Sequence, residues 1–187
     1  MVLNSKTIAI LKAKQRKKSK NHKNAAKTRR QRGYQWEDTI VKRFNSAERW
    51  DAFRLGSPST GLPDVLAVNT LESTIFTMEA KSGTTGSLPV PADQIERCLK
   101  WIKIFDIYKK REVILAFKFL SKKRIGLATY ESRELREFFK IWDRSLPITN
   151  CSCTYEGKVF AQINGKRKVI NLKDCVMPFE KKFRASA

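Results

Sequence analysis

The stretch "GLPDVLAVNTLESTIFTMEAK" (61–81) contains two short runs with strand character, separated by a turn. "DVLAVN" (64–69) is a continuous apolar run of the length typical of a buried strand, and "TLES" follows it as a turn. "TIFTMEAK" (74–81) alternates in hydrophobicity, which is the pattern of a strand with two different faces. The stretch therefore predicts an antiparallel pair of neighbouring strands.

This pairing places charged residues at one end of the hairpin. Asp64 opens the first strand, and Glu79 and Lys81 close the second. Residues i and i+2 share a face of a strand, so Glu79 and Lys81 project the same way, about 7 Å apart at the backbone. The opposite face carries only apolar side chains: Phe76, Met78 and Ala80.

These three residue types suit phosphodiester hydrolysis. Mg²⁺ prefers hard oxygen ligands, and two carboxylates are a suitable minimum. A lysine beside them can orient the attacking water or stabilise negative charge in the transition state. The spacing P-D, fifteen residues, E-x-K is the pattern of the PD-(D/E)xK nucleases, but each half of it also occurs as ordinary surface charge on a hairpin.

Upstream, "RGYQWEDTIVKRFNSAERW" (32–50) has helical apolar spacing. Glu37 falls in the middle of the apolar arc, as a third acid of a site would, while Asp38 projects about 100° away, toward solvent. A strand at 50–56 and a turn-rich loop at 57–63 lead to Asp64. The apolar arc comprises Tyr34, Ile40, Val41, Phe44 and Ala47, and Trp36 at its edge is a candidate dimer contact.

Downstream, the pattern predicts further helices and strands that complete an α/β domain. "EVILAFKF" (112–119) is the most continuously apolar run, which favours an interior strand. The predicted order indicates a mixed sheet flanked by helices. The remaining predicted segments are a flexible loop (82–91), a helix (92–108), a strand (124–130) and a helix (131–143).

The charge of the chain indicates a polyanionic partner. The 187 residues carry a net charge of +21. Residues 1–32 contain 12 Lys or Arg and no Asp or Glu, so the rest of the chain has 27 Lys or Arg and 18 Asp or Glu. Contacts of Lys and Arg with phosphates release counterions, so salt-sensitive nucleic-acid binding is expected. An anionic membrane surface and an acidic protein are the competing partners.

The length suits one domain with extensions. Residues 1–30 form a basic tail that we expect to be disordered in the free protein and to bind nucleic acid, or merely to aid solubility. Residues 31–145 form the globular body. Residues 146–187 form an appended β-hairpin, signalled by Asn164-Gly165 between alternating runs, whose basic turn contacts nucleic acid or is simply solvated.

We expect a cytoplasmic, nucleoid-associated protein. No run approaches the roughly 18 apolar residues of a spanning helix, so no membrane association is expected. The four cysteines are too few for a disulfide scaffold. No structural zinc is expected either, because "CSC" (151–153) and Cys175 lack a fourth ligand, and the only histidine, His22, is in the tail.

Four segments together resemble a known family. "RGYQWEDTIVKRF", "AFRLGSPSTGLPDVLAVN", "FTMEAKSG" and "VILAFKFL", between residue 32 and about 142, resemble the archaeal Holliday junction resolvases of the PD-(D/E)xK nuclease superfamily. The shared pattern is a helix that starts at a basic-glycine pair and carries a glutamate, an "RLGS" segment, an aspartate that opens a strand, and E-x-K. Asp38 stands where relatives have a basic residue, and the tail and terminal hairpin fall outside the family core.

The resemblance implies a restriction-endonuclease-like fold and a homodimer that nicks opposed strands of a four-way DNA junction, in recombination and repair. It implies Mg²⁺ as cofactor, with Mn²⁺ able to substitute. It makes Glu37, Asp64 and Glu79 catalytic metal ligands, Lys81 the catalytic lysine, and Ser57 a catalytic or phosphate-contacting residue. DNA-binding candidates are Arg29, Arg30, Arg32, Arg54, Lys166 and Arg167.

Two alternatives remain open from the sequence. One is a restriction or repair nuclease of the same fold. The other is a non-catalytic basic nucleic-acid-binding protein, which the composition fits and the acidic residues do not.

Overall fold

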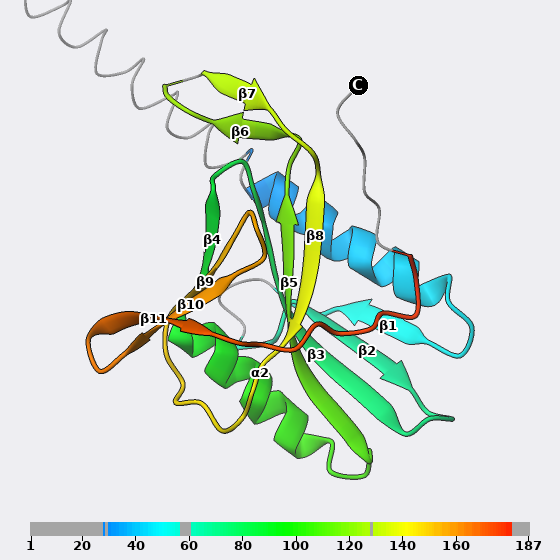
Figure 1. The fold of residues 1–187 in the computed structure, drawn as a ribbon. Coiled ribbons are helices and arrows are strands. Elements are labelled where there is room, and N and C mark those ends of the chain that lie inside the picture. The colour runs from blue at the N-terminus through cyan, green and yellow to red at the C-terminus, as the bar shows by residue number, and fades with distance from the viewer. Residues whose placement is uncertain (1–27, 29, 57–60, 128, 181–187) are drawn as a thin grey trace, which may run out of the picture.

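The two strands predicted within residues 61–81 form neighbouring strands of a five-stranded mixed sheet in a computed structural model (Figure 1). The structure describes residues 28, 30–56, 61–127 and 129–180. The strand order is β1-β2-β3-β5-β8; β3 and β5 are parallel and the other neighbours antiparallel. The strands are β1 (Asp51–Arg54), β2 (Val65–Asn69), β3 (Thr74–Gly83), β5 (Lys110–Phe119) and β8 (Arg136–Ile141). The mixed sheet is confirmed, with β5 in its interior and β3 in its middle.

Alternate side chains of β3 and β5 divide the core into two layers, because successive residues of a strand face opposite sides. One layer packs Ile75, Val113 and Leu115 against α2 (Ala92–Ile104). The other packs Phe76, Met78 and Ala80 of β3, with Ile114 and Ala116 of β5, against the first helix. This helix covers residues 30–45. The predicted alternation of residues 74–81 is therefore confirmed.

The first helix is fixed to the sheet by polar contacts as well as by apolar packing. The indole Nε1 of Trp36 donates a hydrogen bond to the carbonyl of Ala116 in β5, at 3.2 Å. Arg43 forms a bidentate pair with Glu137 of β8, at 2.6 and 3.0 Å. Trp36 is buried, so the expectation of a surface contact at this residue was wrong.

The second helix, α2, ends earlier than predicted. It stops at Ile104, after which Phe105 leaves the helical conformation and accepts a hydrogen bond from Tyr108 N–H in a turn. Asp93 in its first turn and Lys103 in its last turn both complement the helix dipole. No helix of the described chain is long and apolar enough to cross a membrane.

A second sheet, in the order β11-β10-β9-β4, packs on the same face of the main sheet as α2. The hairpin β10 (Val159–Ile163) to β11 (Lys166–Ile170) turns at Asn164-Gly165, both with positive φ, as predicted. The 146–187 segment, expected as an appended hairpin, shares a sheet with earlier residues because β9 (Cys151–Thr154) pairs with β4 (Ser87–Val90). After β11 the chain crosses to the other layer and adds Cys175 and Met177 to it.

Two segments differ from the sequence prediction. Residues 131–143 are not a helix: they contain the end of β7 (Tyr130–Ser132), which pairs with β6 (Lys122–Arg124), and the whole of β8. Strand β8 supplies hydrogen-bond partners for the outer edge of β5, and its aromatic and branched residues suit a sheet. Part of the expected loop at 82–91 is also strand: β4 pairs with β9. The local sequence did not predict this strand, because its partner lies more than 60 residues later in the chain.

Candidate active site

Glu79 and Lys81 lie near the end of β3, on the face that packs against α2. Glu79 is 1% exposed. Its Oε1 accepts from Lys81 Nζ at 2.5 Å, and its Oε2 accepts from Arg97 Nη2 of α2 at 3.2 Å. The carboxylate is therefore held between two cations, as a buried charge requires.

Asp64 lies where three strands meet. Its side-chain Oδ2 accepts a hydrogen bond from the backbone N–H of Ala80 at 2.8 Å. This bond holds the Asp64 carboxylate against β3, next to Glu79. Its own backbone bonds Leu55 on one side and Met78 on the other. The antiparallel pairing of β2 and β3 thus brings Asp64 to the end of β3, as the sequence predicted.

Glu37 faces the sheet from the first helix and is 7% exposed. Its Oε2 is buried with no hydrogen-bond partner. Burial raises the pKa of Glu37 to about 7, and the negative charges of Asp64 and Glu79 add to the rise, against the opposing effects of Arg54 and Lys81. The structure thus brings Glu37, Asp64, Glu79 and Lys81 within electrostatic range of one another.

The pKa of Glu79 is also shifted by burial and by the neighbouring charges. Burial raises its pKa to about 7; Lys81 opposes the rise and Asp64 adds to it. Perturbed carboxyl groups in mutual range are characteristic of functional sites, although structural ion-pair networks also produce them.

The donor set suits Mg²⁺, because it consists of carboxylate oxygens and includes the unpartnered Glu37 Oε2. Among the described residues, however, no three acidic, cysteine or histidine side chains are grouped as a metal-binding cluster. Both oxygens of Glu79 pair with Lys81 and Arg97. The predicted ligands are neighbours, and they do not form a closed coordination shell.

Arg97 is a site residue that sequence reasoning missed. On a helical wheel it lies about 200° from the buried Ile95, which predicts a solvent-facing side chain. Its side chain is nonetheless only 11% exposed, and its guanidinium pairs with Glu79 at 3.2 Å. Only the packing of α2 on β3 reveals this contact.

Arg54, at the end of β1, is tied to the first helix. It forms an ion pair with Asp38 at 3.4 Å, and its guanidinium lies over the ring of Tyr34, 5.0 Å from the centroid. Asp38, expected to face solvent, is exposed and contributes to holding Arg54 near Glu37.

A cavity of about 650 Å³ adjoins Lys81. Arg32, a predicted DNA-binding residue, lines it, and its backbone carbonyl accepts from Ser82 Oγ at 3.2 Å. Gln94 lines it too, with a buried Oε1 that lacks a hydrogen-bond partner, and Arg124 and Tyr130 of the β6–β7 hairpin form another wall.

The remaining predicted residues lie elsewhere. Lys166 and Arg167 are exposed on β11. This strand is three positions from β4 in the second sheet, about 14 Å across the strands. Arg30 is exposed on the first helix. Ser57 and Arg29, like the tail at 1–27, lie outside the described residues, so their roles stay predictions.

The pKa of Glu37 leads to a stability prediction for metal-free protein. The folded-state pKa, about 7, lies above the ordinary value of 4.5, so the folded protein binds more protons than the unfolded chain between these values. The stability contributed by protonated Glu37 is therefore lost as the pH rises through 7. Relative to the wild type, Glu37→Gln should be about equal at pH 5 and more stable at pH 8, by on the order of 1–2 kcal/mol.

Urea denaturation with a chelator, at several pH values, measures this difference. Glu72→Gln, in the exposed turn between β2 and β3, is the matched control and should follow the wild type at every pH. A Glu37→Gln difference that is constant with pH would show that Glu37 does not titrate as its environment predicts.

Comparisons with known proteins give a likeness in structure and none in sequence. No protein-family model and no curated protein matches the sequence. A solved structure of Hjc, a Holliday junction resolvase from the hyperthermophilic archaeon Archaeoglobus fulgidus, aligns with a TM-score of 0.46 and 17% identity, covering 67% of this chain and 85% of that chain. A likeness at this level does not assign the chain to a family, so function must be argued from the residues.

Proposed function

We propose that the protein is a Mg²⁺-dependent, structure-selective endodeoxyribonuclease that resolves four-way DNA junctions in recombination and repair. The observation that carries the nuclease chemistry is the convergence of Glu37, Asp64 and Glu79 with Lys81 at the end of β3. Two buried carboxyl groups with raised pKa values, within range of a third carboxylate and a lysine, support a functional role for this cluster.

In this proposal Asp64, Glu79 and Glu37 hold Mg²⁺, and Mn²⁺ can substitute. When bound, the ion polarises the scissile phosphate and lowers the pKa of a bound water. The carboxylates must be ionised to serve as ligands, and the raised pKa values of Glu37 and Glu79 make metal binding compete with protons near neutral pH.

The cations at the site have separate roles. Lys81 lies beside Glu79, where its ammonium can orient water or stabilise the extra negative charge of the transition state. Arg97 neutralises the second oxygen of Glu79 and so keeps this buried side chain in place. Arg54, whose charge acts on Glu37 from the end of β1, is proposed to contact a phosphate.

Substrate choice is the least constrained part of the proposal. The net charge of +21 supports a nucleic-acid substrate. Paired nicks in opposed strands need two sites, which we assign to a homodimer. The preference for junctions follows from the family resemblance of the sequence motifs.

The proposal is tested by cleavage of a synthetic four-way junction, a matched duplex and a splayed arm, with Mg²⁺ titrated against a chelator. We expect paired, symmetric nicks in the junction, no cleavage without divalent metal, and activity restored by Mn²⁺. Metal-independent cleavage would refute the mechanism, whereas equal cleavage of all three DNAs would leave the chemistry and refute junction selectivity, favouring a restriction or repair nuclease.

The non-catalytic alternative predicts a different result. A basic binding protein would show salt-dependent binding and no turnover on any of the three DNAs. Such a protein has no use for a buried acidic cluster, which is why we favour the nuclease.

A further inference from the structure

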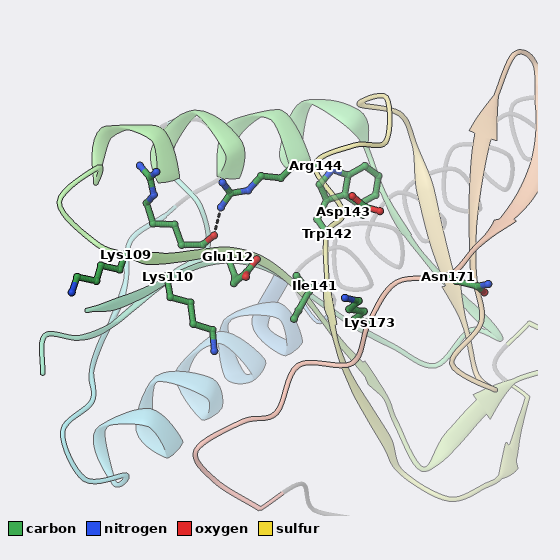
Figure 2. A pocket seen from close by; sticks show the side chains of 10 residues that line it. Lys109, Lys110, Glu112, Ile141, Trp142, Asp143, Arg144, Asn171 and Lys173 are labelled. Carbon is green, nitrogen blue, oxygen red and sulfur yellow. Dashed lines mark hydrogen bonds between the residues drawn. The ribbon is translucent and has the colours of Figure 1, made fainter. Parts of the chain in front are cut away.

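A basic pocket lies at the start of β5 (Figure 2). Its volume is about 600 Å³, and three chain segments that are distant in sequence build its walls. Lys109 immediately precedes β5 and Lys110 begins it, Arg144 comes from the turn after β8, and Lys173 from the segment after β11 (Figure 2). The full lining is Lys109, Lys110, Arg111, Glu112, Ile141, Trp142, Asp143, Arg144, Asn171 and Lys173.

The cations of this pocket outnumber its acids by five to two. Within the described part of the chain, none of the five forms an ion pair. Arg144 donates instead to the backbone carbonyl of Arg111, which fixes its guanidinium in the wall. Asp143 Oδ1 accepts from both the N–H and the hydroxyl of Ser145, at 2.9 and 2.7 Å.

Grouped like charges repel one another, and a bound anion relieves this repulsion. The pocket wall also contains Trp142, which is 1% exposed and whose Nε1 has no hydrogen-bond partner. Four of the five cations are exposed and Arg111 is partly exposed, so an anion from solvent can reach them. The pocket therefore offers several accessible cations in one hollow, which suits an anion.

The pocket is separate from the proposed active site. Lys110 pairs with Thr74 at the start of β3, whereas Glu79 lies five residues farther along the same strand. At about 3.3 Å per residue this is about 17 Å. An anion held here would not touch the acidic cluster.

We propose that this pocket binds the phosphate group of a nucleotide, presented either by a free mononucleotide or by a nucleic-acid backbone. Arg and Lys together match phosphate oxygens by charge and by hydrogen-bond donation. A volume of about 600 Å³ exceeds that of an isolated phosphate and leaves room for the attached sugar. The inference does not rest on the nuclease proposal, because it uses none of the same residues.

The test compares the full-length protein with two doubly substituted variants of equal charge. Lys109→Gln/Lys173→Gln removes two exposed cations from the pocket; Lys122→Gln/Lys158→Gln removes two exposed cations elsewhere. Binding of thymidine 5′-monophosphate is measured by calorimetry, with thymidine as the phosphate-free probe. The Trp142 indole N–H signal in NMR spectra, assigned with Trp142→Phe, reports whether binding occurs in the pocket.

We expect saturable binding of the monophosphate but not of thymidine, a shift of the Trp142 signal, and affinity at least about tenfold weaker in the pocket variant only. Duplex DNA distinguishes the source of the phosphate. If the backbone supplies it, the pocket variant reduces the slope of log affinity against log salt by about 2, since each phosphate contact contributes about 0.9.

A changed slope supports a backbone phosphate, and lost monophosphate binding with an unchanged slope supports a free nucleotide. If the two variants behave alike with both probes, the pocket is only part of the general positive field of the protein and the inference is wrong. Failure of junction cleavage would leave this result unaffected, because neither measurement depends on turnover.

Discussion

Asp64→Asn is expected to lower the rate of junction cleavage by about 10²–10³-fold while leaving junction binding intact. The substitution removes a negative charge that a metal ligand needs. It keeps an oxygen that can accept the hydrogen bond from Ala80 N–H, so the end of β3 should remain in place. Single-turnover cleavage and a binding titration, both with saturating Mg²⁺, separate the chemical step from affinity.

Asp51→Asn is the matched control. Asp51 is exposed at the other end of the β1–β2 hairpin, where it pairs with Val68, so this variant should cleave like the wild type. Full cleavage activity in Asp64→Asn, with unfolding by urea unchanged, would remove Asp64 from the catalytic set and contradict the proposed mechanism. This outcome would not affect the inference about the basic pocket.

Glu137→Gln is expected to destabilise the protein by about 3–5 kcal/mol. The Glu137 side chain is 0% exposed, and it pairs with Arg43 at 2.6 Å and with Lys118 at 3.7 Å. The neutral amide leaves these two largely buried cations without the charge that compensates their desolvation. Urea denaturation of the metal-free protein measures the loss.

Two further variants test the cause. Glu131→Gln removes an exposed ion pair with Lys123 and should cost less than about 1 kcal/mol. Arg43→Met and Lys118→Met combined with Glu137→Leu should recover much of the loss, because apolar residues of similar volume avoid the desolvation penalty of all three charges. If this triple variant is no more stable than Glu137→Gln, then lost packing, and not an uncompensated charge, is responsible.

The Arg43–Glu137 pair also bears on the site. Arg43 is on the first helix, six residues after Glu37, and Glu137 is on β8, so the pair fixes this helix against the sheet. With the Trp36 hydrogen bond to β5, it sets the helix rotation that directs Glu37 toward Asp64 and Glu79. Neither contact could be predicted from sequence, because each joins residues 80 or more positions apart.

Local patterns predicted most of the elements correctly. The alternation of residues 74–81 gave the two faces of β3, and Asn164-Gly165 gave the terminal hairpin. The prediction failed at residues 131–143, where aromatic and charged residues fit a helical period and a strand equally well. These residues form a strand because β8 pairs with the otherwise free edge of β5. The local sequence pattern does not contain this pairing partner.

The sequence by itself determined which acids lie near one another. Asp64, Glu79 and Lys81 are placed by strand alternation and one turn, and Glu37 by the apolar face of its helix, all short-range properties of the chain. The tertiary structure alone decided how those acids are paired and where the remaining positive charge gathers. Arg97 reaches Glu79, and the cations at the start of β5 line one pocket, because packing brings together segments whose side chains have no relation along the sequence.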